Sequence, residues 1–551
     1  MGIITNIAQI VRRRTVINEF IKPTKNPYAY QKRFLFNTIK KNKNTVFGLE
    51  HNFSKIKTIE DFQRNVPIRK YKDFKRYIDE MKIKGSQNVL TKEPFTMFGV
   101  SSGTTGTPKF IPVTRSFIEQ YRRDWDIWVY FAYKDHPKMF DGKILVMVGA
   151  EKEGQTKIGI NYGSISGVIQ NTQKKIIQHF YCLPNSVYKI KNYEAKYYTI
   201  LRIALEQNIS TIVTPNPSMI LILCKKINEY KNEIISDIET GKLSKDYTVE
   251  ENIREELEFK PNPKRAFELM KIDKTHKGLY PKHIWTKLSL IGCWKEGTLP
   301  IYLTQFPKYF GNTPVRDIGL ISTEGHASIP VTDEAKGGVL TVNSSFFEFI
   351  DIKDIKKRIP EVYTLMELER DKDYFLIMTN PNGLYRYFTN DIVKVVGYYN
   401  KTPIIEFLHK GEHVSSITGE KITEWQVVTA MRFAAHRLDV PVHSFTVYPK
   451  FGRLPKYNIL LELHGKCDEK KLGQLINYFD EELKYLNVEY KGKRDSQRLG
   501  RPVIQIVQKG SYSSIHKSKT EAGAHDAQIK IPSLSTDQKF GDDFEVVKVI
   551  R

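Results

Sequence analysis

The pattern of apolar and polar positions changes several times along the chain. Residues 1–85 are rich in charge and carry apolar positions at helical spacing, most clearly over residues 18–41. This spacing predicts a mainly helical lead-in that packs onto a core.

From about residue 86 to 350 the pattern changes to short apolar runs bounded by Gly, Pro and Asn. These runs alternate with longer amphipathic stretches. Four of these apolar runs each predict a buried strand followed by a loop. They begin at residues 142, 209, 287 and 315. Repeated strand, loop and helix units predict an α/β fold, with mixed sheets and helices on their faces.

Two further stretches complete the predicted organisation. Residues 340–408 alternate in the manner of strands separated by turns, which predicts a β-rich, barrel-like unit closing a large N-terminal domain of residues 1–420. Residues 421–551 then predict a small α+β domain. Its predicted order is a helix within 417–438, a strand at 456–465, a helix at 468–483 and a strand at 501–512.

Composition supports a globular protein of more than one domain. The chain has 551 residues, of which 40% are hydrophobic, enough for a sizeable core. The excess of 86 basic over 62 acidic residues gives a net charge of +24, which would suit nucleic acid, an anionic membrane or a polyphosphate substrate. Because the lysines are spread over the whole length and no nucleic-acid signature is present, a solvated lysine-rich surface is favoured, and no specific nucleic-acid partner is expected.

Cysteine spacing and hydropathy bear on the compartment. The four cysteines lie dozens of residues apart, without a CxxC pair or zinc-ligand spacing, which favours a reducing cytoplasm. The first apolar stretch precedes its arginines, the wrong order for a secretory signal. No window of 18 apolar residues exists, so no membrane span is expected. We expect a cytoplasmic monomer.

The segment SSGTTGTPK, residues 101–109, is the strongest candidate for chemistry. Its hydroxyl and backbone N–H groups can donate to an anion, its glycines let the backbone approach closely, and Lys109 supplies a point charge for terminal phosphates. The spacing excludes a P-loop, because that motif places its lysine directly after the second glycine. The segment therefore predicts a phosphate-binding loop of another kind, with a surface turn as the alternative.

Two carboxylates could complete a nucleotide site. Glu324 follows the apolar run that begins at residue 315, and at a strand end it could hold Mg²⁺ against phosphates. Asp391, predicted to start a strand after a polar turn, could accept hydrogen bonds from a ribose diol. Taken alone, a glutamate at a strand end is more often a solvated cap or a member of an ion pair, and Asp391 is equally well a turn aspartate before a strand. Lys421 and Lys530, by count alone, are surface charges.

These segments occur together in an order that resembles the Gretchen Hagen family of acyl acid amido synthetases, which belong to the adenylate-forming enzymes. The match rests on SSGTTGTPKFIP, STEG, YRYFTNDIVKVVGYYNKTP and AQIKIP, with NVPIRKYKDF, FFEF and ITGEKITE as further similarities. The chain looks more like the family's bacterial members. The resemblance implies that Mg-ATP activates a carboxylic acid as an acyl-adenylate with release of pyrophosphate, after which an amino acid or other amine takes the acyl group and AMP leaves.

The resemblance also implies roles for single residues. The small C-terminal domain is implied to rotate between the two half-reactions. Lys421 at its hinge and Lys530, which stabilises charge on the α-phosphate, are implied to be catalytic, and Glu324 to be both catalytic and a metal ligand. Residues implied on ATP are Ser101, Ser102, Gly103, Thr104, Thr105, Lys109, Thr323 and Asp391. One departure is Asn390, which stands where the family's Tyr-Arg-x-Gly-Asp pattern has glycine; asparagine tolerates positive φ, so we expect the turn to persist.

The acyl pocket and the acceptor are the least specified parts. By position and resemblance, Gly163, Ser164, Thr214 and Asn216 are expected to line the pocket, with a loop and a buried helix start as the alternatives. A ligase that passes the acyl group to coenzyme A or another thiol shares the same motifs. Outside enzymes, the net charge leaves a polyanion-binding protein without catalysis as a further alternative.

Overall fold

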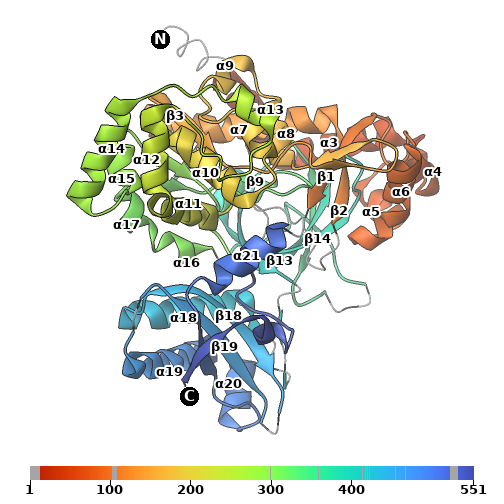
Figure 1. Ribbon diagram of the computed structural model, residues 1–551. Coiled ribbons are helices and arrows are strands. Elements are labelled where there is room, and N and C mark those ends of the chain that lie inside the picture. Colours follow the sequence, from red (N-terminus) through yellow and green to blue (C-terminus); the bar gives the residue numbers. More distant parts are fainter. Residues whose placement is uncertain are drawn as a thin grey trace. The chain divides into compact units, whose positions relative to one another are not determined.

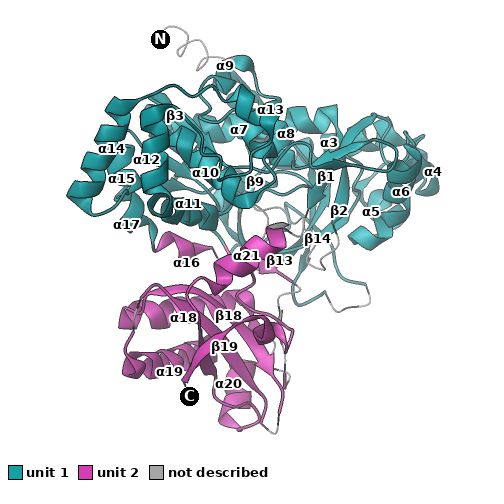
Figure 2. Cartoon of the chain, viewed as in Figure 1, with its two compact units in different colours: residues 1–296, 305–407 teal, residues 297–304, 408–551 magenta. Residues whose placement is uncertain are grey.

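The chain folds as two compact units. The computed structural model describes residues 13–101, 108–297, 299–355, 357, 359–411, 414–415, 417–418, 420, 422–452, 454–465, 467–521 and 531–550. Unit 1 comprises residues 1–296 and 305–407, and unit 2 comprises residues 297–304 and 408–551 (Figure 2).

Unit 1 begins with helices, as predicted for its described part. The longer ones are α3 (Pro27–Asn42), α5 (Ile59–Asn65) and α6 (Tyr71–Lys84), and α6 ends at Gly85 in the left-handed conformation, a common helix C-terminus. Phe62 and Phe74 from these helices share one apolar cluster with Phe346 and Tyr385 from the β-rich region. The lead-in is therefore packed into the body of unit 1.

The strands within residues 86–316 form two four-stranded sheets. One has the order β2-β1-β5-β4, from β1 (Phe95–Ser101), β2 (Lys109–Thr114), β4 (Gly154–Gln155) and β5 (Asn161–Gly163). The other is parallel, in the order β3-β6-β7-β8, from β3 (Lys143–Val146), β6 (Ile209–Val213), β7 (Leu290–Gly292) and β8 (Val315–Arg316).

Helices pack against these sheets and against one another, which confirms the predicted α/β fold. Among them, α7 (Arg115–Asp135) lies on β7, since a Cβ atom at Gly292 would stand 2.9 Å from the ring of Trp128. On the left of unit 1 in Figure 1 lie α10 (Tyr193–Ala204), α11 (Pro217–Glu229), α12 (Lys231–Thr240) and α14 (Pro263–His276).

The β-rich region predicted at 340–408 is a seven-stranded sheet of order β12-β11-β13-β14-β15-β10-β9. Its longer strands are β11 (Phe346–Asp351), β13 (Asp373–Thr379), β14 (Tyr387–Tyr399) and β15 (Thr402–Lys410). The short strands β9 (Ser328–Ile329), β10 (Gly338–Leu340) and β12 (Tyr363–Thr364) complete it.

Unit 2 is an α+β fold, as predicted. Its sheet has the order β18-β19-β20-β21, from β18 (Val442–Lys450), β19 (Lys456–Leu463), β20 (Val503–Val507) and β21 (Val546–Ile550). Helices α18 (Glu424–Leu438) and α19 (Glu469–Leu486) cover it, and α20 (Val488–Asp495) and α21 (Ser511–Glu521) complete the unit. The strand predicted at 501–512 is shorter than expected, because α21 has already begun at Ser511.

A short segment far from the rest of unit 2 in sequence also belongs to it. Residues 297–304 include the one-turn helix α16 (Pro300–Leu303), and Tyr302 packs against the main apolar cluster of unit 2. The sequence pattern did not predict that residues 297–304 belong to unit 2. The four cysteines are free, and within the described residues no helix has the length and apolar character needed to cross a bilayer.

Candidate active site

The predicted phosphate-binding segment joins two paired strands. Strands β1 and β2 are antiparallel, and Ser101 and Lys109 are partners in their register. Ser102, Gly103, Thr104 and Thr105 lie outside the described residues. The Nζ atom of Lys109 is 5.8 Å from the ring centroid of Tyr71, whose hydroxyl accepts the backbone N–H of Phe110 at 2.8 Å.

The STEG segment is a tight turn held from several sides. The Ser322 N–H donates to the carbonyl of Gly325 at 2.9 Å, and the side-chain amide of Asn380 donates to the carbonyl of Glu324 at 2.7 Å. Thr323 is buried against β1: a Cβ atom at Gly99 would stand 2.8 Å from the Thr323 methyl group. The absence of a side chain at Gly99 thus lets this turn lie directly on the strand that leads into the phosphate segment.

The sequence suggested that this turn directly follows a strand, but the structure places it farther along the chain. Strand β8 ends at Arg316, eight residues before Glu324. The Asp317 carboxylate accepts the N–H groups of Gly319 and Lys295, and Gly319 has φ of +83°. These local bonds compete with strand pairing and end β8 early.

Glu324 and Asp391, distant in sequence, both act on Tyr387. Burial raises the pKa of Tyr387 well above its ordinary value; the Glu324 carboxylate, which shares a hydrogen bond with it, and the Asp391 charge raise it further. The Glu324 side chain is half-buried, whereas Asp391 is buried. The same Glu324 charge contributes to the raised pKa of Tyr71, after burial and a nearby aspartate. Glu324, Asp391, Tyr71 and Tyr387 therefore form one electrostatic cluster near Lys109.

Asp391 lies inside β14 rather than at its start, which corrects the sequence prediction. The ladder between β13 and β14 is irregular here: Phe375 pairs with Ile392, and Ile377 already pairs with Phe388. The extra residues form a bulge in which the Asp391 N–H donates to the Thr389 hydroxyl at 3.1 Å. Asn390 has φ of +63°, so the expected positive-φ conformation is confirmed.

Tyr385 and Arg386, the first two residues of the YRYFTNDIVKVVGYYNKTP segment, lie outside this cluster. The Tyr385 hydroxyl donates to the carbonyl of Leu90 at 2.8 Å, and Arg386 pairs with Glu348 at 3.0 Å. Tyr387 instead stands four residues before Asp391, the spacing of the Tyr-Arg-x-Gly-Asp pattern, with Phe388 in place of arginine. Sequence reasoning missed Tyr387, and this spacing was the signal that could have found it.

The residues predicted for the acyl pocket fall into two places. Gly163 pairs with Gly99 of β1, and Ser164 directly precedes α8 (Ile165–Asn171), so these two adjoin the STEG turn through β1. Thr214 and Asn216 follow β6 in the other sheet, where the Asn216 side chain caps α11 by accepting the Ser218 N–H at 3.0 Å. Asn216 therefore has the structural role that the alternative reading, a buried helix start, expects.

Comparison with known proteins decides the family. The family model of the GH3 N-terminal domain matches residues 16–315, that of the GH3 central domain residues 338–410, and that of the GH3 C-terminal domain residues 425–539. The chain belongs to the GH3 family.

Several curated GH3 proteins are similar over nearly the whole chain. Jasmonoyl-L-amino acid synthetase JAR4 of Nicotiana attenuata is 26% identical over 539 residues, covering 94% of this chain and 92% of the relative. The 4-substituted benzoates–glutamate ligase GH3.12 of Arabidopsis thaliana is 25% identical, covering 86% of this chain and 87% of the relative. A solved structure of the AtGH3.15 acyl acid amido synthetase in complex with 2,4-DB has a TM-score of 0.86 at 22% identity, covering 98% of this chain and 97% of that one.

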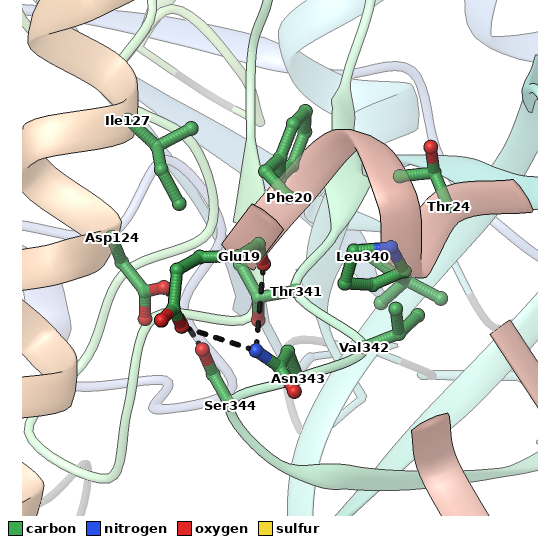
Figure 3. A pocket seen from close by; sticks show the side chains of 11 residues that line it. Glu19, Phe20, Thr24, Asp124, Ile127, Leu340, Thr341, Val342, Asn343 and Ser344 are labelled. Atoms are coloured by element: carbon green, nitrogen blue, oxygen red, sulfur yellow. Dashed lines mark hydrogen bonds between the residues drawn. The ribbon is translucent and has the colours of Figure 1, made fainter. Parts of the chain in front are cut away.

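One small cavity of the GH3 fold lies apart from the predicted site residues (Figure 3). It has a volume of about 10 Å³, about the space of one water molecule, and separates α7 from residues 340–344. The Ser344 hydroxyl donates to the Asp124 carboxyl group at 2.8 Å, and burial raises the pKa of Asp124 to about 8. None of the predicted site residues lines this cavity.

Proposed function

We propose that this GH3 protein is an ATP-dependent acyl acid amido synthetase, a ligase that forms C–N bonds. In the first step a carboxylate oxygen of the acid attacks the α-phosphorus of ATP, giving an acyl-adenylate and pyrophosphate. In the second step an amine nitrogen attacks the acyl carbon, the C–O bond to AMP breaks, and the amine proton is lost to solvent or to AMP. The observation that carries the proposal is the match to all three GH3 domains in one chain.

The nucleotide is proposed to lie along the β1–β2 hairpin and the STEG turn. Ser101, Ser102, Gly103, Thr104 and Thr105 hold the phosphates, with Lys109 as a counter-charge. Thr323 lies beside the nucleotide, and Asp391 accepts hydrogen bonds from the ribose. The register of Ser101 with Lys109 and the common effect of Glu324 and Asp391 on Tyr387 support this placement.

Glu324 is proposed as the protein ligand of Mg²⁺. The described residues contain no group of three His, Cys, Asp or Glu side chains suited to a metal ion. A half-buried single carboxylate fits a Mg²⁺ ion that completes its shell with water and the phosphates of ATP. When bound, the ion supplies charge neutralisation for the departing pyrophosphate.

The C-terminal residues 421–551 are proposed to act as a domain that changes position between the two steps, relative to residues 1–420. Lys421 lies at its hinge, and Lys530 stabilises the charge that develops on the α-phosphate. Both lysines lie outside the described residues, so their support is the match of the AQIKIP and ITGEKITE segments to the family.

The substrates are proposed to be a small carboxylic acid, bound near Gly163, Ser164, Thr214 and Asn216, and an amino acid or other amine.

We further propose that the protein resembles bacterial members of the family and works as a cytoplasmic monomer without a nucleic-acid partner. Four free cysteines suit a reducing compartment.

The Asp391→Ala variant is expected to weaken ATP binding by about 1.5–3 kcal/mol, because hydrogen bonds to a charged group are lost. Isothermal titration with a non-hydrolysable ATP analogue measures the change. Asp371→Ala, an exposed aspartate at a turn, is the matched control. Equal affinity in the Asp391 variant and the wild type would remove Asp391 from the nucleotide site.

Pyrophosphate release from Mg-ATP over a panel of aromatic, jasmonate-like and fatty acids tests the whole proposal. Each acid is assayed alone, with a mixture of amino acids and with coenzyme A, and the products are identified by mass. Acid-dependent release with an acyl–amino acid product supports the amido synthetase. A thioester product would make the protein an acyl–coenzyme A ligase, and binding of ATP without release for any acid would contradict catalysis.

A further inference from the structure

The chain passes between the two units three times, after residues 296, 304 and 407. The first and third passages are joined inside unit 1 by a side chain. The Oε2 atom of Glu296, the last residue before the first passage, accepts the backbone N–H of Phe407, the last residue before the third, at 2.7 Å. One hydrogen bond thus ties two segments that are 111 residues apart.

Both partners of this bond are anchored in unit 1. The ammonium group of Lys295, the residue before Glu296, donates to the carbonyl of Val315 at 3.0 Å and to that of Asp333 at 2.6 Å. Phe407 lies in β15, two residues beyond Ile405, which pairs with Gly338 at the start of β10. The Glu296 carboxyl group therefore meets β15 just past the point where β10 begins.

The Glu296 side chain sits in a setting that favours its neutral form. The residue is partly buried, its Oε1 atom is shielded from solvent, and the backbone N–H groups of Phe407 and Gly337 act on its carboxyl group to lower its pKa. Burial raises the pKa of Glu296 well above its ordinary value, and the Asp317 and Glu406 carboxylates raise it further. Lys295 lies beside Asp317, while Lys336, Lys394 and Asp373 face Glu406.

We propose that Glu296 is a positioning residue for the ligase reaction, because its carboxyl group ties into one joint the two segments of unit 1 that lead into residues 297–304 and 408–420. If these segments were separate, the chain that runs on to the proposed hinge at Lys421 would start from a looser base and place Lys530 less accurately. This inference rests on the proposed function, in which Lys530 of unit 2 must reach the nucleotide. Glu296 itself touches neither substrate nor nucleotide in this scheme.

Three variants distinguish the effect of the Glu296–Phe407 hydrogen bond on the reaction from a loss of stability of unit 1 as a whole. Glu296→Leu removes the acceptor and is expected to slow both pyrophosphate release and amide formation on the order of 10- to 100-fold, since small misplacements of reacting groups have such effects. Its ATP affinity should stay within about twofold of wild type, because the proposed phosphate contacts lie in unit 1. Glu296→Gln keeps an acceptor oxygen for the Phe407 N–H and should retain wild-type turnover. Glu406→Gln, which removes the neighbouring charge without touching the Phe407 N–H, is the control.

Hydrogen exchange gives a readout besides activity. In Glu296→Leu the Phe407 N–H loses its acceptor, so exchange within residues 402–410 should be faster than in the wild type. Glu296→Gln, which keeps an acceptor oxygen, should exchange at the wild-type rate.

Several outcomes would overturn the inference. Wild-type turnover in Glu296→Leu would do so, as would equal impairment of the Gln and Leu variants or a parallel loss of ATP affinity. If the wild type itself proved inactive with every acid, the proposed function would fail. Hydrogen exchange in residues 402–410 would still decide whether Glu296 holds the joint.

Discussion

Replacing Lys530 by alanine is expected to slow acid-dependent pyrophosphate release by about 10²–10³-fold, the usual effect of removing one group that stabilises transition-state charge. ATP binding should change little, because the proposed phosphate contacts come from the β1–β2 hairpin and Lys109. Rapid-quench measurement of pyrophosphate in a single turnover separates this chemical step from product release.

Lys519→Ala is the matched control for this variant. Lys519 lies on α21, close in sequence to Lys530, and is a lysine without an implied role. Loss of ATP affinity equal to the loss of rate would make Lys530 a binding residue instead of a catalytic one. Unchanged pyrophosphate release would exclude it from the reaction.

Replacing Arg386 by methionine is expected to destabilise unit 1 by about 3–5 kcal/mol, because it leaves a buried carboxylate without its partner. The Arg386 guanidinium contacts Glu348 at 3.0 Å and donates to the carbonyls of Gln63 and Val66, both at 2.8 Å. Glu348 is only 1% exposed, so water cannot replace the lost charge. Urea unfolding followed by circular dichroism measures the change.

Two companion variants sharpen this prediction. Arg370→Met removes an exposed arginine with a weak partner at 3.8 Å and should be nearly neutral. Adding Glu348→Gln to Arg386→Met should recover part of the lost stability, because the uncompensated charge is removed. A loss below about 1 kcal/mol in Arg386→Met would mean that the pair contributes little more than a surface ion pair.

Elements defined by local apolar spacing were predictable. The helix expected at 468–483 is α19 at Glu469–Leu486, and the strand expected at 456–465 is β19 at Lys456–Leu463. In both, the residues that face the core recur at the period of the element itself, so no distant partner is needed to specify them. The motifs likewise identified candidate residues that act on a common neighbour in the structure, since Glu324 and Asp391 both raise the pKa of Tyr387.

Features that depend on distant partners were not predictable. The run at 315–325 is apolar enough for a strand, yet Asp317 and Gly319 end β8 through bonds to their own loop and to Lys295. Arg386 resembles part of a catalytic motif, but its partner Glu348 is 38 residues away and makes the arginine structural. A single sequence does not show which distant residues pair, because the two side chains come together only when the sheet forms.

The insertion of residues 297–304 into unit 2 has a consequence for how such proteins can be recombined. A graft made at one junction near residue 408 would transfer α18 to α21 but leave behind Tyr302, which packs on the main apolar cluster of unit 2. The transplanted unit would then expose a surface shaped for the missing aromatic ring. A chimaera that exchanges unit 2 between two members therefore needs two crossover segments, and a chimaera made at a single junction should be poorly soluble.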